Sequence, residues 1–339
     1  MTRASMPGRA RLLEILHRFA GKRIVVLGDL VADEFVYGDI QRVSREAPVL
    51  VLEHRETACV PGGGANAVAN LRALDASPVP VGVVGADEAG QRIVAQFREA
   101  GVKTSGIRAE PGYRTPAKSR ILAGGVHTRR QQIVRIDRGA RHGSLPRAVL
   151  ARVRARLERE ASRAEGLLIA DYGYGAATPA LLRGLRLRDR APVTVDSRER
   201  VLSFRRVLAC TPNQEEVERA LGLPPLRGSA SLEEAGRALL RRTGDRAVLI
   251  TRGARGMSLF ERGRPTLHIP AFGSDEVADV TGAGDTVIAV FSLSLLTGAT
   301  FLEAALLANL AAGIVVMKLG TATVGRREMR AAIEEGYPS

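Results

Sequence analysis

Short, continuous apolar runs recur along this chain of 339 residues, and each is followed by glycine or by polar residues. Runs this short are typical of strands that are buried on both faces of a parallel sheet. Helical apolar patterns lie between them. We therefore predict a doubly wound, mainly parallel α/β sheet with helices on both faces. The runs are 24–27, 79–84, 167–170, 193–195, 207–210 and 247–251.

Polar side chains at the ends of these runs would share one edge of the sheet, where open α/β folds bind ligands. Such residues follow four successive runs: Asp171, Asp196, Thr211 and Thr251. One residue of this kind is usually a cap, but four in succession favour a ligand site. Asp29 and Asp33 follow the first run and are candidates to hold substrate hydroxyl groups. The alternative is a cap at Asp29 and a solvated Asp33.

Two segments, 35–54 and 112–138, have short alternating apolar patterns instead. We predict that they form strands outside the main sheet and make a small β lid that excludes water from the site. An arginine-rich, amphipathic lead at 1–22 predicts a surface helix. The main domain would then be 23–325, followed by a C-terminal tail at 326–339.

A glycine turn leads into an apolar helical pattern near residue 282. Gly282, Ala283 and Gly284 would let backbone N–H groups at the helix start approach an anion. Asp285 follows at once and would repel that anion. The conflict disappears if Asp285 is a base that takes a proton from a hydroxyl attacking phosphorus. The alternative is an acidic residue at a helix start with no chemical role.

A second glycine-rich turn, 61–66, also precedes a helical pattern. It matches neither common nucleotide fingerprint, because it has no Gly-Lys-Ser/Thr ending and no third spaced glycine. Gly63, Gly64 and Asn66 therefore have two interpretations. They bring backbone and an amide against a polyhydroxy ligand, or they allow close packing at a helix start.

Asn213 and Glu216 lie three residues apart in the first turn of a predicted helix. The spacing suits a carboxylate that holds a Mg²⁺-bound water, since Mg²⁺ commonly keeps much of its water shell. It suits a helix-capping pair equally well. Taken alone, the pair favours capping.

The net charge of +14 comes mainly from arginine, since lysine occurs only at positions 22, 103, 118 and 318. The arginines are scattered in short clusters without interleaved aromatic residues, so we predict no nucleic-acid partner. Cys59 and Cys210 show no metal-ligand spacing, which favours a reducing compartment. We find no signal segment and no run as long as a membrane span, and we expect a cytoplasmic protein without a membrane partner.

Together these features resemble the ribokinase-like (pfkB) family of carbohydrate kinases, from about residue 23 to residue 325. Segment 279–285 is similar to the family's C-terminal signature, 61–66 to its N-terminal signature, and 213–216 to its Asn-x-x-Glu motif. The resemblance implies a ribokinase-like fold, ATP and Mg²⁺ as cofactors with a monovalent cation as a further candidate, and a homodimer.

The resemblance also implies roles for individual residues. Asp285 would be the catalytic base, with the amides of 282–284 as an anion hole. Glu216 would act on Mg²⁺ through water, and Asp29 and Asn66 would hold sugar hydroxyls, with Asp33, Gly63, Gly64 and Asp171 beside them.

The nucleotide would lie across the ends of the later strands, near one further helix. The residues concerned are Asn213, Thr251, Gly253, Gly256, Asn309 and Gly313. Two glycines after a strand end suit close backbone approach to phosphates. The alternatives are a hairpin turn before 257–260 and simple helix packing for Asn309 and Gly313.

Within the family the likeness is greatest to kinases that phosphorylate the anomeric oxygen of D-glycero-β-D-manno-heptose 7-phosphate. It is carried by 28–33, 42–49 and 115–120, with further matches at 131–137 and 308–321. A sugar phosphate needs a cationic receiver, and four residues of the lid segments are candidates: Arg45, Lys118, Arg120 and Arg135. For each of them the alternative is a solvated charge.

Two positions depart from the pattern of the heptose kinases. Gly64 stands where alanine is usual, and Ser197-Arg198 replaces a Pro-Lys pair. No His-x-Gly-His motif is present, so a second, nucleotidyltransferase activity is not expected. Three alternatives remain: another sugar or nucleoside kinase of this fold, a nucleic-acid-binding protein, and a ligand-sensing pseudokinase.

Overall fold

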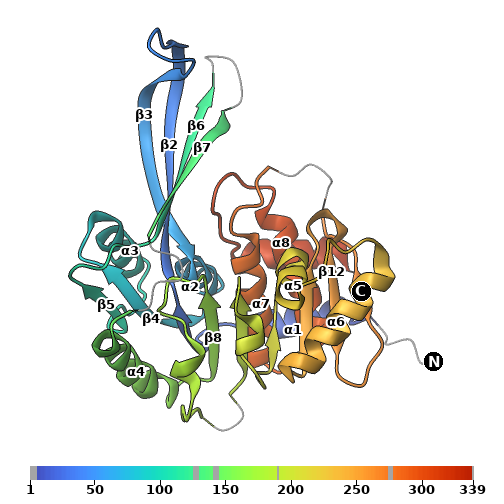
Figure 1. The fold of residues 1–339 in the computed structure, drawn as a ribbon. Coiled ribbons are helices and arrows are strands. Elements are labelled where there is room, and N and C mark those ends of the chain that lie inside the picture. Colours follow the sequence, from blue (N-terminus) through green and yellow to red (C-terminus); the bar gives the residue numbers. More distant parts are fainter. Residues whose placement is uncertain (1–5, 125–129, 140–144, 189–190, 274–277, 338–339) are drawn as a thin grey trace.

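The computed structural model describes residues 6–124, 130–139, 145–188, 191–273 and 278–337. Within them, one sheet has the strand order β13-β12-β11-β10-β9-β8-β1-β4-β5 (Figure 1). Neighbours from β5 to β11 pair in parallel, whereas β12 and β13 are antiparallel. The predicted doubly wound, mainly parallel sheet is therefore confirmed. Its strands are β1 (Arg23–Gly28), β4 (Ser77–Gly85), β5 (Ile107–Glu110), β8 (Gly166–Asp171), β9 (Val193–Ser197), β10 (Ala209–Cys210), β11 (Ala247–Thr251), β12 (Met257–Glu261) and β13 (Leu267–Ile269).

Helices cover both faces of this sheet, because side chains of a buried strand alternate between two cores. Val26 of β1 lies in one core, and its neighbours Val25 and Leu27 lie in the other. The first core is covered by α1 (Arg9–His17), α2 (Gly64–Ala73), α3 (Glu88–Glu99), α7 (Ala283–Leu296), α8 (Phe301–Val315) and α9 (Arg326–Gly336). The second is covered by α4 (Arg147–Ala161), α5 (Gln214–Leu221) and α6 (Gly228–Thr243). Short 3₁₀ helices lie at Pro179–Leu182, Val201–Ser203 and Gly253–Arg255.

A second, smaller sheet projects from the body of the molecule (Figure 1). Its order is β3-β2-β6-β7, with β2 and β6 parallel and the other two pairs antiparallel. The strands are β2 (Leu30–Val43), β3 (Leu50–Gly63), β6 (Ala117–Gly124) and β7 (Gln131–Arg138). The predicted extra strands are confirmed, but β2 and β3 extend well beyond 35–54. Their inner ends reach the main sheet and bring Asp33 and Gly63 to its carboxyl edge.

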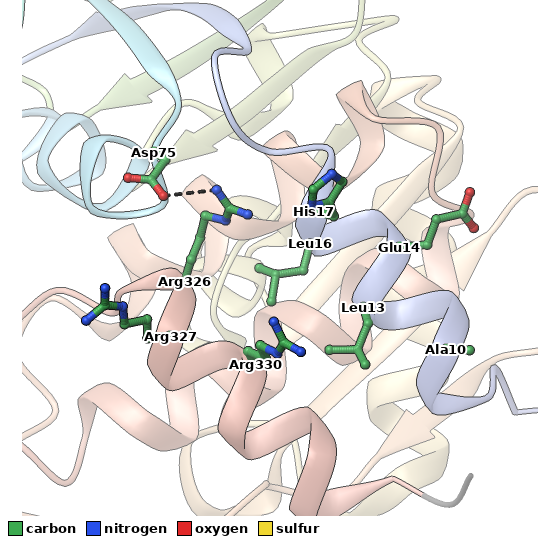
Figure 2. Close-up of a pocket in the computed structure, with 9 residues that line it drawn as sticks. All are labelled: Ala10, Leu13, Glu14, Leu16, His17, Asp75, Arg326, Arg327 and Arg330. Atoms are coloured by element: carbon green, nitrogen blue, oxygen red, sulfur yellow. Dashed lines mark hydrogen bonds and ion pairs between the residues drawn. The ribbon is translucent and has the colours of Figure 1, made fainter.

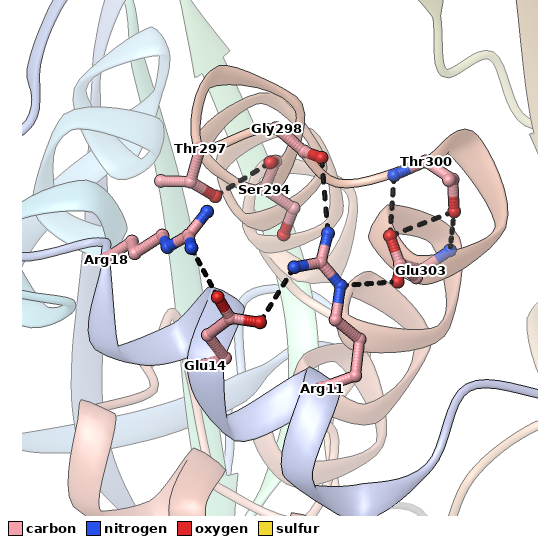
Figure 3. Close-up of polar contacts among 8 residues, drawn as sticks. All are labelled: Arg11, Glu14, Arg18, Ser294, Thr297, Gly298, Thr300 and Glu303. Carbon is pink, nitrogen blue, oxygen red and sulfur yellow. Dashed lines mark hydrogen bonds and ion pairs between the residues drawn. The ribbon is translucent and has the colours of Figure 1, made fainter.

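The described part of the predicted lead forms α1, which is fixed to the turn between α7 and α8 (Figure 3). Arg11 Nε donates to Glu303 Oε1 at 2.8 Å, and Arg11 Nη1 donates to Glu14 Oε2 at 2.8 Å. Glu303 also caps α8 through the backbone N–H of Thr300 at 2.7 Å. One carboxylate thus joins the start of α8 to α1.

Most of the predicted C-terminal tail is a helix, α9, which packs beside α1. Met329 and Ile333 of α9 are fully buried. A hollow of about 530 Å³ lies between the two helices, with Leu16 and His17 on one side and arginines on the other (Figure 2). Among the described helices, none has both the length and the apolar character needed to cross a lipid bilayer.

Candidate active site

A cavity of about 280 Å³ lies at the carboxyl edge of the main sheet, beneath the inner end of the small sheet. Strand ends, the starts of α5 and α7, and strands β2, β6 and β7 all contribute to its wall. The position agrees with the ligand edge predicted for such a sheet. Eleven of the predicted residues line it: Asp33, Gly63, Lys118, Arg120, Arg135, Asn213, Glu216, Thr251, Gly282, Gly284 and Asp285.

Asp285 lies in the first turn of α7 and is almost fully buried, although it reaches the cavity. Each of its carboxylate oxygens accepts one hydrogen bond. The Tyr172 hydroxyl donates to Oδ1 over a very short distance, and Asn66 Nδ2 donates to Oδ2 at 3.0 Å. Burial raises the pKa of Asp285 to about 6, while these two donors and the charge of Lys118 act in the opposite direction. Its pKa therefore lies near the range in which a general base works well.

The turn before Asp285 requires glycine at position 282, which has φ +82° and precedes Ala283 at the start of α7. A Cβ atom there would lie 2.6 Å from Asn66 Nδ2. Gly284 faces open space. The first N–H groups of α7 have no partner within the helix, so the turn can present them to an anion.

A chain of buried amides holds Asn66 behind Asp285. Asn70 Nδ2 donates to Asn66 Oδ1 at 3.1 Å, and the Thr286 hydroxyl donates to Asn70 Oδ1 at 3.1 Å. Because Asn66 Oδ1 is occupied in this way, its Nδ2 group must face Asp285. Asn66 thus contacts the proposed base and does not line the cavity.

Two of the predicted cations enter the cavity wall from β6 and are buried: Lys118 and Arg120. Arg120 forms an ion pair of 2.8 Å with Asp33, whose other oxygen accepts from the Thr321 hydroxyl at 2.9 Å. Burial lowers the pKa of Lys118 to about 8. Arg135 is more exposed and pairs with Asp137 on its own strand. Among the described residues, Lys118 is thus the one of these three cations that forms no ion pair with a carboxylate.

Asn213 and Glu216 form a capping box at the start of α5. Glu216 Oε2 accepts from the Asn213 N–H at 2.8 Å, and the Glu216 N–H donates to Asn213 Oδ1 at 2.9 Å. Both side chains nevertheless line the cavity, so capping and a role toward a metal are compatible. Burial raises the pKa of Glu216. A cation nearby would offset that penalty on the charged carboxylate.

Two strand-end residues named above, Asp196 and Thr211, also line the cavity, together with Tyr172 and Arg198, which the sequence did not single out. The Arg198 guanidinium lies 4.5 Å from the centroid of the Tyr172 ring. Burial, and then the charge of Glu216, raises the pKa of Asp196 well above its usual range. All four lie within or just past the last residues of a strand, so their position along the chain was a signal. Which of two adjacent residues faces the cavity depends on the loop that follows each strand.

Asp29 and Asp171 do not line the cavity, and protein groups occupy their carboxylates. Asp29 accepts backbone N–H groups of the loop after β8, at distances from 2.8 to 3.4 Å: Tyr172, Tyr174, Ala176 and Ala177. Asp171 accepts from the Ser197 hydroxyl at 2.7 Å and forms an ion pair with Arg200. Both carboxylates therefore hold loops at the edge of the site. These hydrogen bonds agree with a capping role better than with contact to a sugar.

Close packing accounts for Gly64, Gly256, Gly313 and Asn309, whereas Gly253 has a left-handed backbone, with φ +58°, and open space around it. A Cβ atom on Gly64 would lie 3.0 Å from Asp29 O, and one on Gly256 would lie 2.1 Å from Ile269 O. Gly313 packs in the same way against Phe272, and Asn309 Nδ2 donates to Pro270 O at 2.8 Å. Gly253 begins the 3₁₀ turn between β11 and β12. The hairpin and helix-packing alternatives therefore describe these residues, which do not line the cavity.

The cavity is suited to a divalent cation that brings its own water and phosphate ligands. Within the described ranges, no three His, Cys, Asp or Glu side chains gather as a preformed metal site. Asp196 and Glu216 both line the cavity, and burial and then the charge of Glu216 contribute to the raised pKa of Asp196. Mg²⁺ is commonly bound through one or two carboxylates plus substrate phosphates.

A doubly wound sheet with a small sheet over its ligand edge, and an aspartate at the start of a helix there, defines a ribokinase-like kinase. Two solved structures support this architecture. Arabidopsis thaliana ribokinase complexed with ribose and ATP has a TM-score of 0.71 and 20% identity, covering 93% of this chain and 99% of its own. Escherichia coli phosphofructokinase-2 has a TM-score of 0.74 and 14% identity, covering 92% and 98%.

The model of the pfkB family carbohydrate kinases matches residues 22–327. The chain belongs to this family. The Caulobacter vibrioides bifunctional protein HldE is 39% identical over 328 residues, covering 94% of this chain and 65% of that protein. The HldE protein of Geobacter metallireducens is 41% identical over 309 residues, covering 90% and 61%. The chain thus spans less than two thirds of the length of these curated relatives.

Proposed function

We propose that the protein uses ATP to phosphorylate the anomeric O1 of D-glycero-β-D-manno-heptose 7-phosphate, giving the 1,7-bisphosphate for ADP-heptose biosynthesis in the cytoplasm. The observation that carries the reaction type is Asp285, buried at the cavity and placed at the start of α7. The heptose rests on the likeness of 42–49 and 131–137 to heptose kinases and on the identity to HldE proteins.

The reaction needs a base and an anion site at one point, and the start of α7 provides both. Asp285 accepts the proton of the acceptor hydroxyl, while the leading N–H groups of α7 stabilise charge on the transferring group. Phosphoryl transfer depends mainly on alignment and charge stabilisation, so the buried Lys118 and the half-buried Arg198 complete the site.

The nucleotide would enter along the ends of β10 and β11, where Asn213 and Thr251 line the cavity. Mg²⁺, when bound with ATP, supplies charge neutralisation between the phosphates. Glu216 and Asp196 would hold it through water. The 7-phosphate would lie toward the small sheet, where Lys118 and Arg135 provide positive charge.

The decisive experiment measures ADP release with a panel of acceptors: the heptose 7-phosphate, fructose 6-phosphate, ribose, adenosine and none. We expect the heptose 7-phosphate to give the highest kcat/KM. Turnover of ribose or adenosine alone would replace the heptose by another substrate of this fold. No ATP turnover with any acceptor would contradict the kinase assignment.

The small sheet also supports a homodimer as the working form. It carries a group of exposed apolar side chains: Val43, Val49, Leu50, Ile133, Val134 and Ile136. An exposed apolar surface of this kind marks an interaction site. We expect light scattering to give the mass of two chains, and Ile136→Asp to reduce it to one; a monomeric wild type would contradict this proposal.

A further inference from the structure

Tyr172 links the loop after β8 to the proposed base, and the mechanism above leaves its role open. Its hydroxyl donates to Asp285 Oδ1, 113 residues away in the chain. We propose that Tyr172 is a positioning residue, which aims the Asp285 carboxylate at the acceptor hydroxyl and keeps it ionised. This inference rests on the proposed function.

The backbone of Tyr172 is fixed independently of its side chain. Its N–H donates to Asp29 Oδ2 at 2.8 Å, and the N–H groups of Tyr174 and Ala176 donate to the same carboxylate at 3.0 and 2.8 Å. Asp29 follows β1 directly, so the loop is tied to the centre of the main sheet. The Tyr172 hydroxyl is therefore held in place by a backbone that is itself fixed.

The ring is held by close neighbours on several sides. Lys118 Nζ lies 5.0 Å and the Arg198 guanidinium 4.5 Å from its centroid. A Cβ atom on Gly63 would lie 2.9 Å from Val31 Cγ2 and 3.3 Å from the ring edge, so a side chain there would crowd the ring. Burial, and then the charge of Asp285, raises the pKa of the Tyr172 hydroxyl well above its usual value. The hydroxyl thus stays protonated and acts only as a donor toward the carboxylate.

The arrangement leaves room for the substrate. Each carboxylate oxygen can accept two hydrogen bonds, and from the described residues the two oxygens of Asp285 receive one each, from Tyr172 and Asn66. One further position on each oxygen remains for an acceptor hydroxyl. Two donors also stabilise the ionised form, against the burial that raises the Asp285 pKa.

Tyr172→Phe removes the hydroxyl and keeps the ring between its neighbours. Loss of a donor to the carboxylate should raise the Asp285 pKa, so the acid limb of kcat against pH should move to higher pH. We expect a shift of about one pH unit, which is up to tenfold in rate on that limb. A lower kcat on the pH-independent plateau would report a misoriented Asp285 carboxylate. The KM for ATP should change little.

Tyr174→Phe is the matched control. Tyr174 lies on the same loop, and its buried hydroxyl has no hydrogen-bond partner among the described residues. We expect its pH profile to coincide with that of the wild type. If the acid limbs of Tyr172→Phe and the wild type coincide as well, the positioning role is overturned.

A carboxyl ¹³C titration of Asp285 in the substrate-free enzyme tests the same shift without turnover. Its resonance is assigned by its loss in Asp285→Asn, and its pKa should rise in Tyr172→Phe. An unchanged pKa would overturn the inference. Failure of the proposed function looks different, since wild type would then turn over no acceptor, or Asp285→Asn would remain active.

Discussion

Asp29 and Asp285 are two buried aspartates near the same sheet edge, with burial raising the pKa of each to about 6. Their surroundings differ. Four backbone N–H groups converge on Asp29, which has no place on the cavity wall. Asp285 receives two side-chain donors and lines the cavity. A carboxylate saturated by backbone fixes a loop, whereas one with positions left open can exchange a proton with a ligand.

Asp285→Asn tests the reactive side of this comparison and should have the largest effect. General-base assistance is typically worth ~10²–10⁴-fold in rate, so kcat should fall by at least ~10²-fold. Substrate KM should be largely kept, because the change is nearly isosteric. Steady-state ADP release at saturating ATP measures this. Turnover near the wild-type rate would remove Asp285 as the base.

Asp29→Ala tests the structural side. It leaves buried N–H groups of the loop after β8 without their acceptor, so the free energy of unfolding should fall by about 2–4 kcal/mol. Urea unfolding followed by circular dichroism measures the loss. Asp29→Asn keeps one acceptor oxygen and should lose less. A stable Asp29→Ala with a raised sugar KM would instead place Asp29 in substrate binding, as the sequence suggested.

The pH dependence of stability should be shared by both aspartates. An unfolded aspartate titrates near pH ~3.9, and the folded forms titrate near pH 6. The folded protein therefore binds protons more tightly between these values, and both groups favour folding more as pH falls through 6. The stability of Asp285→Asn relative to wild type should drop by on the order of 1–3 kcal/mol from pH 7 to pH 4. Asp29→Asn should follow the same trend, and a flat difference for either would separate the two sites.

Glu303 gives the smallest expected effect and the opposite sign. Burial acts to raise its pKa, but the hydrogen bonds from Arg11 and Thr300 outweigh it, and the pKa is lowered. Its contribution is thus present at neutral pH and is lost as pH falls through the folded pKa. Glu303→Gln should lower stability by about 0.5–1.5 kcal/mol at pH 7, with less effect at pH 3. Calorimetry at both pH values checks this, with Glu88→Gln, whose exposed carboxylate pairs with Arg92, as a surface control.

The parts of the site that the sequence predicted are those encoded by local patterns. The glycine turn before Asp285 and the capping pair Asn213 and Glu216 are contiguous segments whose geometry follows from their own residues. The alternating segments likewise predicted the small sheet.

Contacts between distant segments were not predictable in this way. The residues around Asp29 do not indicate whether its carboxylate binds a sugar or a loop. The loop that donates to it lies more than 140 residues later in the chain. Tyr172 reaches Asp285 only through the folded arrangement of β8 and α7. The sequence pointed to its neighbour Asp171 as a site residue, because a carboxylate can bind a sugar hydroxyl. In the structure Asp171 forms an ion pair with Arg200.

Two of the junctions that join the small sheet to the body, those of β2 and β3, contain almost no linking residues. Only Asp29 separates β1 from β2, and β3 passes directly into α2 between Gly63 and Gly64. The Gly64 N–H donates to Asp29 O at 3.0 Å, which ties the two junctions together. Any swing of the small sheet must therefore involve dihedral rotations at this pair, beside the residue that anchors Tyr172. Hydrogen exchange at the Gly64 amide would therefore report the motion of a sheet whose tip lies far from it.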